Sequence, residues 1–147
     1  MDEISPVERF FTSHHPANAT LKIRYRGFAD GVLSVELEAT PEFVADEATG
    51  ALHSGFATLA LDTVMGGAVL GSLDKIQPFA TAGLTSQHMR RPVSGERLVC
   101  RARCEGVHSD IAHMSGQLVS AQSGEVLSTA TGTFMIGTRA KPLGSRV

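Results

Sequence analysis

Cysteine is scarce in this sequence, which excludes a fold held together by a disulfide framework. The two that occur, Cys100 and Cys104, fall in a stretch that alternates like a strand. Four residues of strand rise would separate them by roughly 13 Å, whereas a disulfide needs Cα atoms about 4.4–6.8 Å apart. We therefore expect both cysteines to be reduced thiols in the core.

An excess of charge of either sign is also lacking, because 13 basic residues stand against 15 acidic ones for a net charge of -2. Nucleic-acid-binding proteins normally show a basic face and a high pI, so no nucleic-acid partner is expected. The six histidines have no cysteine or carboxylate at ligand spacing, so no metal is expected. The first residues, MDEISPVERF, lack the basic and apolar regions of a secretory signal, and the expected location is therefore the cytoplasm.

One long apolar run is present, from Leu52 to Leu73, and it carries a single carboxylate, Asp62. Because the run also holds four glycines and two serines and lies in mid-chain, it favours a buried helix, with no membrane as partner. Its apolar residues occupy the whole circumference, so we predict a helix buried on all sides. An unpartnered carboxylate removed from water costs on the order of several kcal/mol, so Asp62 must be either paired or functional.

The rest of the sequence predicts a short N-terminal helix and a sheet. Ser5-Pro6 starts the helix, which should end near His14 to Pro16. Strand-like segments follow, and turn residues between the last three predict an antiparallel meander. These segments are 21–26, 33–39, 80–91, 97–107, 110–121 and 126–136. The predicted class is therefore α+β, with one long helix against a mostly antiparallel sheet in a single domain, residues 1–147.

This order of elements, together with HSGFATLALDTVMG at residues 53–66, resembles the hotdog-fold acyl-CoA thioesterases of the phenylacetate pathway, the PaaI-like family. The likeness continues in Arg91-Pro92, in GERL at 95–98 and in ATGTF at 130–134, and it covers residues 17–137. The resemblance implies a hotdog fold, in which a sheet of about six strands wraps one central helix. It also implies a hydrolase that converts an acyl-CoA thioester to a free acid and coenzyme A.

Family members carry a catalytic Asp or Glu nine residues after the histidine that opens the helix, which matches His53 and Asp62. The resemblance implies that Asp62 is a nucleophile or general base and that the Gly55 N–H polarises the carbonyl. Seven helical residues separate these two by about 10.5 Å, too far for both to act on one carbonyl within one subunit. Hotdog enzymes place this site across a homodimer, so we expect a homodimer or a tetramer built from dimers. Coenzyme A is part of the substrate, and no cofactor is expected.

The same resemblance implies further substrate-binding positions. His53 is expected to cap or orient the start of the helix. Ser54 replaces a family glycine, and Glu47 stands where some members carry an asparagine that orients the attacking water or carboxylate. Thr81, Ala82 and Thr85 fall near the position where family members place a hydroxyl that supports the nucleophilic water.

Arg90 and Arg91 are candidates for the coenzyme A phosphates, because guanidinium suits phosphate geometry, although a solvated strand end would also explain them. The structural alternative for Asp62 is a helix carboxylate satisfied by hydroxyl or backbone donors. Two other functions stay open. One is a non-catalytic hotdog protein that binds acyl-CoA, which Ser54 and Glu47 favour. The other is an enoyl-CoA hydratase or dehydratase, for which Asp62 lies too deep in the helix.

Overall fold

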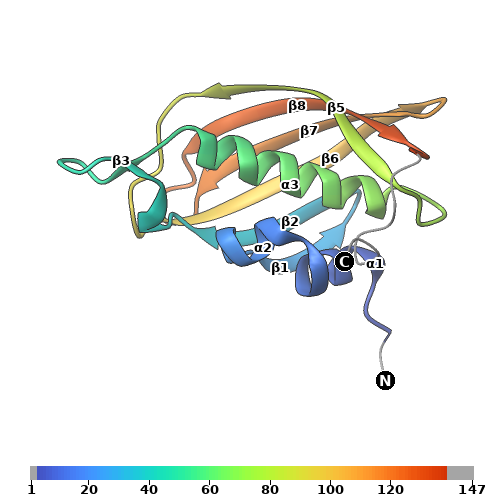
Figure 1. The fold of residues 1–147 in the computed structure, drawn as a ribbon, viewed down its shortest axis with the longest axis horizontal. Helices are drawn as coiled ribbons and strands as arrows, with labels where there is room; N and C mark the ends of the chain where they lie inside the picture. The colour runs from blue at the N-terminus through green and yellow to red at the C-terminus, as the bar shows by residue number, and fades with distance from the viewer. Residues whose placement is uncertain (1–2, 139–147) are drawn as a thin grey trace.

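The computed structural model describes residues 3–138, so the outermost ends of the predicted domain, residues 1–2 and 139–147, lie outside the described residues. A six-stranded sheet has the spatial order β1, β2, β6, β7, β8, β5, and every neighbouring pair is antiparallel (Figure 1). The strands are β1 Arg24–Ala29, β2 Val32–Glu38, β5 Phe79–His88, β6 Arg97–His108, β7 Ile111–Ser120 and β8 Val126–Ile136. The predicted α+β class and the final meander are confirmed.

The long helix α3, Gly55–Gly71, lies across one face of this sheet and contacts β2, β5, β6, β7 and β8 (Figure 1). Its buried side chains, such as Phe56, Leu61 and Met65, join the inner-face residues of the strands in one core. The prediction that this helix is buried on all sides is wrong along one stripe, because Thr58 and Asp62 are only half-buried. This stripe faces β5, the edge strand of the sheet, beyond which residues 3–138 supply no further cover.

The N-terminal segment forms a layer over the side of α3 that the sheet leaves uncovered (Figure 1). It consists of α1 Pro6–Arg9, the π-helical turn η1 Phe10–His14 and α2 Pro16–Leu21. The predicted end of the first helix is close to the observed one, but α2 was not expected. Pro16 starts α2 and His15 caps it, so Leu21 is a buried helical residue and not the start of a strand.

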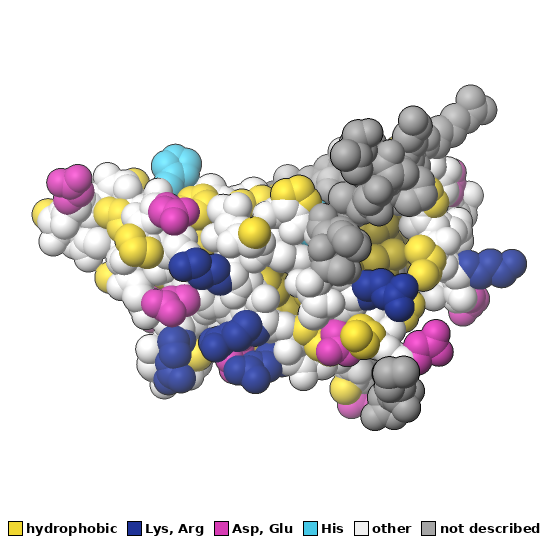
Figure 2. Space-filling model, turned by 60° about the horizontal axis from the view of Figure 1, so that its bottom comes forward, with side chains coloured by type: hydrophobic (Ala, Val, Ile, Leu, Met, Phe, Trp, Pro, Cys, Tyr) yellow, Lys and Arg dark blue, Asp and Glu magenta, His cyan; other side chains and the backbone are white. Residues whose placement is uncertain are grey.

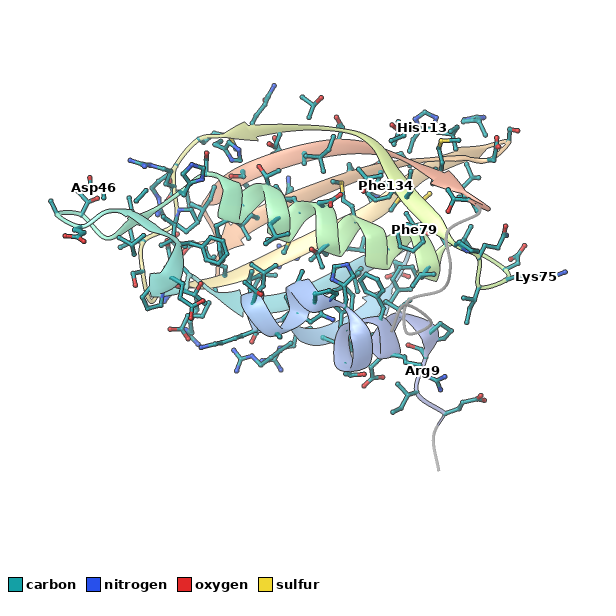
Figure 3. The ribbon with its side chains drawn as sticks, viewed as in Figure 1. Arg9, Asp46, Lys75, Phe79, His113 and Phe134 are labelled. Atoms are coloured by element: carbon teal, nitrogen blue, oxygen red, sulfur yellow. The ribbon has the colours of Figure 1, made fainter. Side chains whose placement is uncertain are left out.

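Glycines let the N-terminal layer and β5 approach α3 closely. A Cβ on Gly67 would lie 2.5 Å from Phe11 Cζ, and a Cβ on Gly66 would lie 3.2 Å from Phe79 Cε2. Phe79 also packs edge-on against Phe134 with ring centroids 6.1 Å apart, beside the C-terminal half of α3 (Figure 3). Because Gly66 and Gly67 have no side chain, the N-terminal layer and β5 can pack closely against this part of α3.

Strand β5 forms an open edge of the sheet. It pairs with β8 on one side, and its residues are mostly exposed. A bulge between Thr81 and Gly83 shifts the register, so that Thr81, Ser86 and His88 all point to the α3 side. An exposed edge of ten residues presents unpaired backbone groups that another strand can satisfy.

A small hairpin, β3 Val44–Asp46 and β4 Ala51–Leu52, extends from the sheet beside the start of α3, with Asp46 near its tip (Figure 3). The 3-10 turn η2 Pro41–Phe43 precedes this hairpin. Basic side chains on the face shown in Figure 2 lie beside acidic ones. No helix within residues 3–138 is long and apolar enough to cross a membrane.

Both cysteines are free thiols, as predicted. Cys100 lies on the buried inner face of β6, and burial raises the pKa of its thiol to about 12. Cys104 lies on the same strand and is half-buried.

Candidate active site

The start of α3 is organised by one histidine. His53 lies just before the helix, and its Nδ1 accepts a hydrogen bond of 2.9 Å from the Gly55 N–H. Its backbone carbonyl accepts a second bond, of 3.0 Å, from the Phe56 N–H. Ser54 occupies the N-cap position without a side-chain capping bond. His53 therefore satisfies two backbone donors that a helix start leaves without intrahelical partners.

Asp62 lies two turns further along the same uninterrupted helix. Its Oδ1 accepts a hydrogen bond of 2.8 Å from the Thr81 hydroxyl on β5. Asp62 is half-buried, so this bond orients a carboxylate that solvent or a ligand can still reach. Ala82 is exposed at the β5 bulge and has no hydroxyl, and Thr85 alternates with Leu84 onto the opposite face of the strand. Thr81 is therefore the residue that β5 brings to Asp62.

One turn before Asp62, a cluster of hydroxyls and an imidazole joins α3 to β5 and β8. Thr58 Oγ1 lies 3.3 Å from Ser86 Oγ and 3.5 Å from His88 Nε2, and Ser86 Oγ lies 3.2 Å from the same nitrogen. The other ring nitrogen, Nδ1, lies 2.8 Å from the hydroxyl of Ser128, which is 1% exposed. The His88 ring is thus contacted at both nitrogens: its Nδ1 faces the buried Ser128, and its Nε2 faces the half-buried Ser86 and Thr58.

Thr58 and Asp62 are four residues apart and so share one face of α3. Together with Thr81, Ser86 and His88 they form a polar stripe between this helix and the inner side of β5. From the sequence, hydroxyl donors to Asp62 were considered only in general terms, and Ser86 and His88 were not identified. Their signal was two polar residues in phase with Leu84, at positions of β5 that face the core side.

His15 approaches Asp62 from the N-terminal layer. It is half-buried, its Nδ1 accepts a 3.2 Å hydrogen bond from the Ala17 N–H, and its ring packs against Phe10 with centroids 4.9 Å apart. Burial lowers the pKa of His15, while the nearby charge of Asp62 opposes that shift. From the sequence, only the end of a helix was placed here, because a histidine next to proline carries no signal of its burial against α3.

The other predicted residues lie around the start of α3. Glu47 is exposed in the turn of the β3–β4 hairpin, and Arg91 is exposed after the end of β5. Arg90 is instead engaged in an ion-pair network. Its guanidinium contacts both carboxylate oxygens of Glu96, at 3.0 and 2.7 Å, and lies 3.1 Å from Glu125.

This network ties the end of β5 to the loop before β6 and to the start of β8. The two carboxylates raise the pKa of Arg90, and the Arg90 guanidinium lowers the pKa of Glu96. Since Arg90 already holds two carboxylates, Arg91 is the better placed of the pair to meet an external anion.

No protein family and no curated protein matches the chain by sequence, whereas many solved structures share its fold. A phenylacetic acid degradation-related protein from Ralstonia eutropha is 26% identical with a TM-score of 0.75, over 89% of this chain and 99% of that one. A mutant of the phenylacetic acid degradation protein PaaI from Thermus thermophilus is 21% identical with a TM-score of 0.71, over 82% and 98%. The chain has the hotdog fold of the PaaI-like thioesterases.

A third hotdog protein in the comparison is a hypothetical thioesterase from Streptococcus pneumoniae, determined with coenzyme A. It is 17% identical to this chain with a TM-score of 0.68, over 80% of this chain and 88% of that one. The helix that the hotdog fold wraps is α3, so the polar stripe lies where its central helix meets the open edge of the sheet.

Proposed function

We propose that this protein is a thioester hydrolase that converts an acyl-CoA to a free acid and coenzyme A. The observation that carries the proposal is the Asp62 carboxylate, oriented by Thr81 on the accessible stripe of the central helix of a hotdog fold. The fold neighbour determined with coenzyme A supports a ligand of this class. Acyl groups of short to medium length or with an aromatic ring are the first to test.

The active site in this proposal lies across a homodimer. Gly55 and Asp62 stand on one continuous helix, separated by about 10.5 Å along its axis, so one chain cannot bring both to the same carbonyl. Pairing of two β5 edges would cover an exposed strand and lay the two half-buried stripes side by side. Around a two-fold axis, the Gly55 end of one subunit then meets Asp62 of the other. A tetramer would be two such dimers.

The chemistry needs a base, a donor and water. Asp62 removes a proton from water as the oxygen attacks the thioester carbon, and the carbonyl oxygen becomes an anion held by the Gly55 N–H of the partner subunit. The C–S bond then breaks, its electron pair stays on sulfur, and the proton held by Asp62 passes to the thiolate. Direct attack by Asp62 would give an acyl anhydride that water hydrolyses to the same products.

Substrate-binding roles follow from position around the start of α3. His53 and Ser54 shape the loop that presents Gly55, and Glu47 belongs to the hairpin beside it. Arg91 is the proposed contact for a coenzyme A phosphate, and Arg90 supports the segment that carries Arg91 through its ion pair with Glu96. No three His, Cys, Asp or Glu side chains within residues 3–138 are grouped as metal ligands.

A second candidate is a hotdog protein that binds acyl-CoA without hydrolysing it. One observation favours it: the Gly55 N–H already donates to His53 Nδ1 at 2.9 Å, so the His53 ring must move before this donor can meet a carbonyl. A protein in which His53 never moves would hold the thioester without polarising it through Gly55.

The test is thiol release from a panel of acyl-CoA esters by the wild type and by Asp62→Asn. Hydrolysis should fall by about 10²- to 10⁴-fold in the variant, because a positioned base contributes that much. Binding of acyl-CoA without thiol release would favour the second candidate, and formation of a hydrated acyl-CoA would favour a hydratase. Hydrolysis at the wild-type rate by Asp62→Asn would remove Asp62 from the mechanism.

A further inference from the structure

The cluster of Thr58, Ser86, His88 and Ser128 has no role in the mechanism as described so far. It lies on the Gly55 half of the stripe, because Thr58 is three residues after Gly55 on the first turn of α3. In the proposed dimer this half faces the partner's Asp62. Packing of α3 against β5 does not require hydroxyls around a fixed imidazole, because a pair of apolar residues would fill the same contact.

The Gly55 N–H alone would stabilise the developing oxyanion only weakly. That donor is engaged with His53 in the structure, and an oxyanion is best stabilised by donors already aimed at it. Thr58 is half-buried and its hydroxyl lies on the accessible side of the helix, one turn from the carboxylate position. It is thus the nearest side-chain donor to Gly55 on the stripe.

We propose that the Thr58 hydroxyl is a second oxyanion donor to the thioester carbonyl, and that His88 is the positioning residue that directs this hydroxyl. The inference rests on the proposed thioesterase function. Thr58 touches the substrate oxygen, so it is catalytic, whereas His88 acts through Thr58 and Ser86.

The hydrogen bonds of the cluster give His88 control over the direction of the Thr58 proton. When the proton of the neutral ring is on Nε2, this nitrogen donates to Ser86, Ser86 donates to Thr58, and the Thr58 O–H is left to donate outward. Ser128, buried behind the ring, then donates to Nδ1 and stabilises that tautomer. An outward donor at Thr58 is what a carbonyl oxygen gaining negative charge requires.

The experiment compares kcat and KM for acyl-CoA hydrolysis across variants of the cluster. Thr58→Val removes the hydroxyl at nearly constant shape, and kcat should fall by about 10²-fold, while KM changes little. Thr58→Ser keeps the donor and should retain most of the wild-type kcat. His88→Ala should lower kcat less than Thr58→Val does. Thr85→Val, on the opposite face of β5, is the matched control and should keep the wild-type kcat.

The double variant Thr58→Val/His88→Ala separates positioning from a merely structural role. If His88 acts through Thr58, the double variant is no slower than Thr58→Val alone, because the two effects are not additive. If the losses in kcat of the two single variants add in the double variant, the role of His88 is overturned. The role is also overturned if the fall in kcat of His88→Ala is matched by a loss of its unfolding free energy, measured in urea. Wild-type kcat in Thr58→Val, with Asp62→Asn inactive, would overturn the inference and leave the thioesterase standing. Absence of hydrolysis in the wild type itself would overturn both.

Discussion

At the scale of single residues, the Thr81 hydroxyl that meets Asp62 at 2.8 Å connects the central helix to the edge strand. Thr81→Val should lower kcat by about 10- to 100-fold, since a hydrogen bond to a charged group contributes about 1.5–3 kcal/mol. Steady-state kinetics of thiol release measure this, with Thr81→Ser as the control that keeps the hydroxyl. A Thr81→Val enzyme with unchanged kcat would mean that Asp62 needs no orienting partner.

His15 should make folding stability depend on pH. Burial lowers its pKa in the folded protein below the usual 6.5, so the unfolded chain binds the proton more tightly. Its contribution to stability is therefore complete above about pH 6.5 and is lost as the pH falls from there through the lower, folded-state pKa. The unfolding free energy of the wild type should fall over this range more steeply than that of His15→Asn.

Urea unfolding at a series of pH values provides the comparison. His15→Asn is the suitable variant because asparagine can still accept the Ala17 N–H at the start of α2. Equal pH slopes for the two proteins would contradict the burial of His15 against the central helix.

Prediction of single residues from the sequence succeeded where a residue differed in polarity from its neighbours in the chain. Asp62 was identifiable as the single carboxylate in an apolar run, and Thr81 as one of three nearby positions on the same predicted strand. The contacts of His88 were not readable from the sequence, because its partners Thr58 and Ser128 are brought to it by a helix and a strand that are distant in sequence.

At the scale of elements, close approach between layers depends on the glycines of α3. Gly67→Ala would put a Cβ 2.5 Å from Phe11 and 3.1 Å from Leu33. Overpacking costs about 1–3 kcal/mol, against about 0.8–1.0 kcal/mol gained from the better helix propensity of alanine. We expect a net loss of unfolding free energy and faster hydrogen exchange in α1 and η1.

Gly106→Ala is the control, because its Cβ would meet nothing closer than 3.6 Å and should leave hydrogen exchange of α1 and η1 unchanged. An increase in stability of Gly67→Ala by the helix-propensity amount would contradict the tight packing of the N-terminal layer. Alternation along the chain predicted the strands of the meander well. It failed at residues 21–23, the start of the predicted strand 21–26, because Pro16 and the His15 cap start a helix that runs to Leu21 and packs against α3.

At the scale of the whole molecule, the sheet order leaves β5 as an edge and α3 with one incompletely covered stripe, and both features lie on the same side. The sequence predicted one long helix against an antiparallel sheet, which the structure confirms. The prediction of a second subunit, from the spacing of Gly55 and Asp62 along one helix, stays a prediction. The sequence could not predict which edge is open, since strand order depends on long-range pairing.

The most direct test of the central claim, an active site shared between two subunits, is complementation between two inactive variants. Asp62→Asn lacks the base, and Gly55→Val disturbs the helix start, where a Cβ would lie 2.9 Å from His53 Nδ1. Each variant is assayed alone and after the two are unfolded, mixed in equal amounts and refolded together. Sedimentation of each sample verifies that dimers form.

A shared site predicts that the mixture regains about a quarter of wild-type activity, because half of the dimers are mixed and each mixed dimer holds one intact site. If both residues served a site within one subunit, every site in the mixture would lack one of them. A refolded mixture that forms mixed dimers yet stays as inactive as its parents would contradict the account.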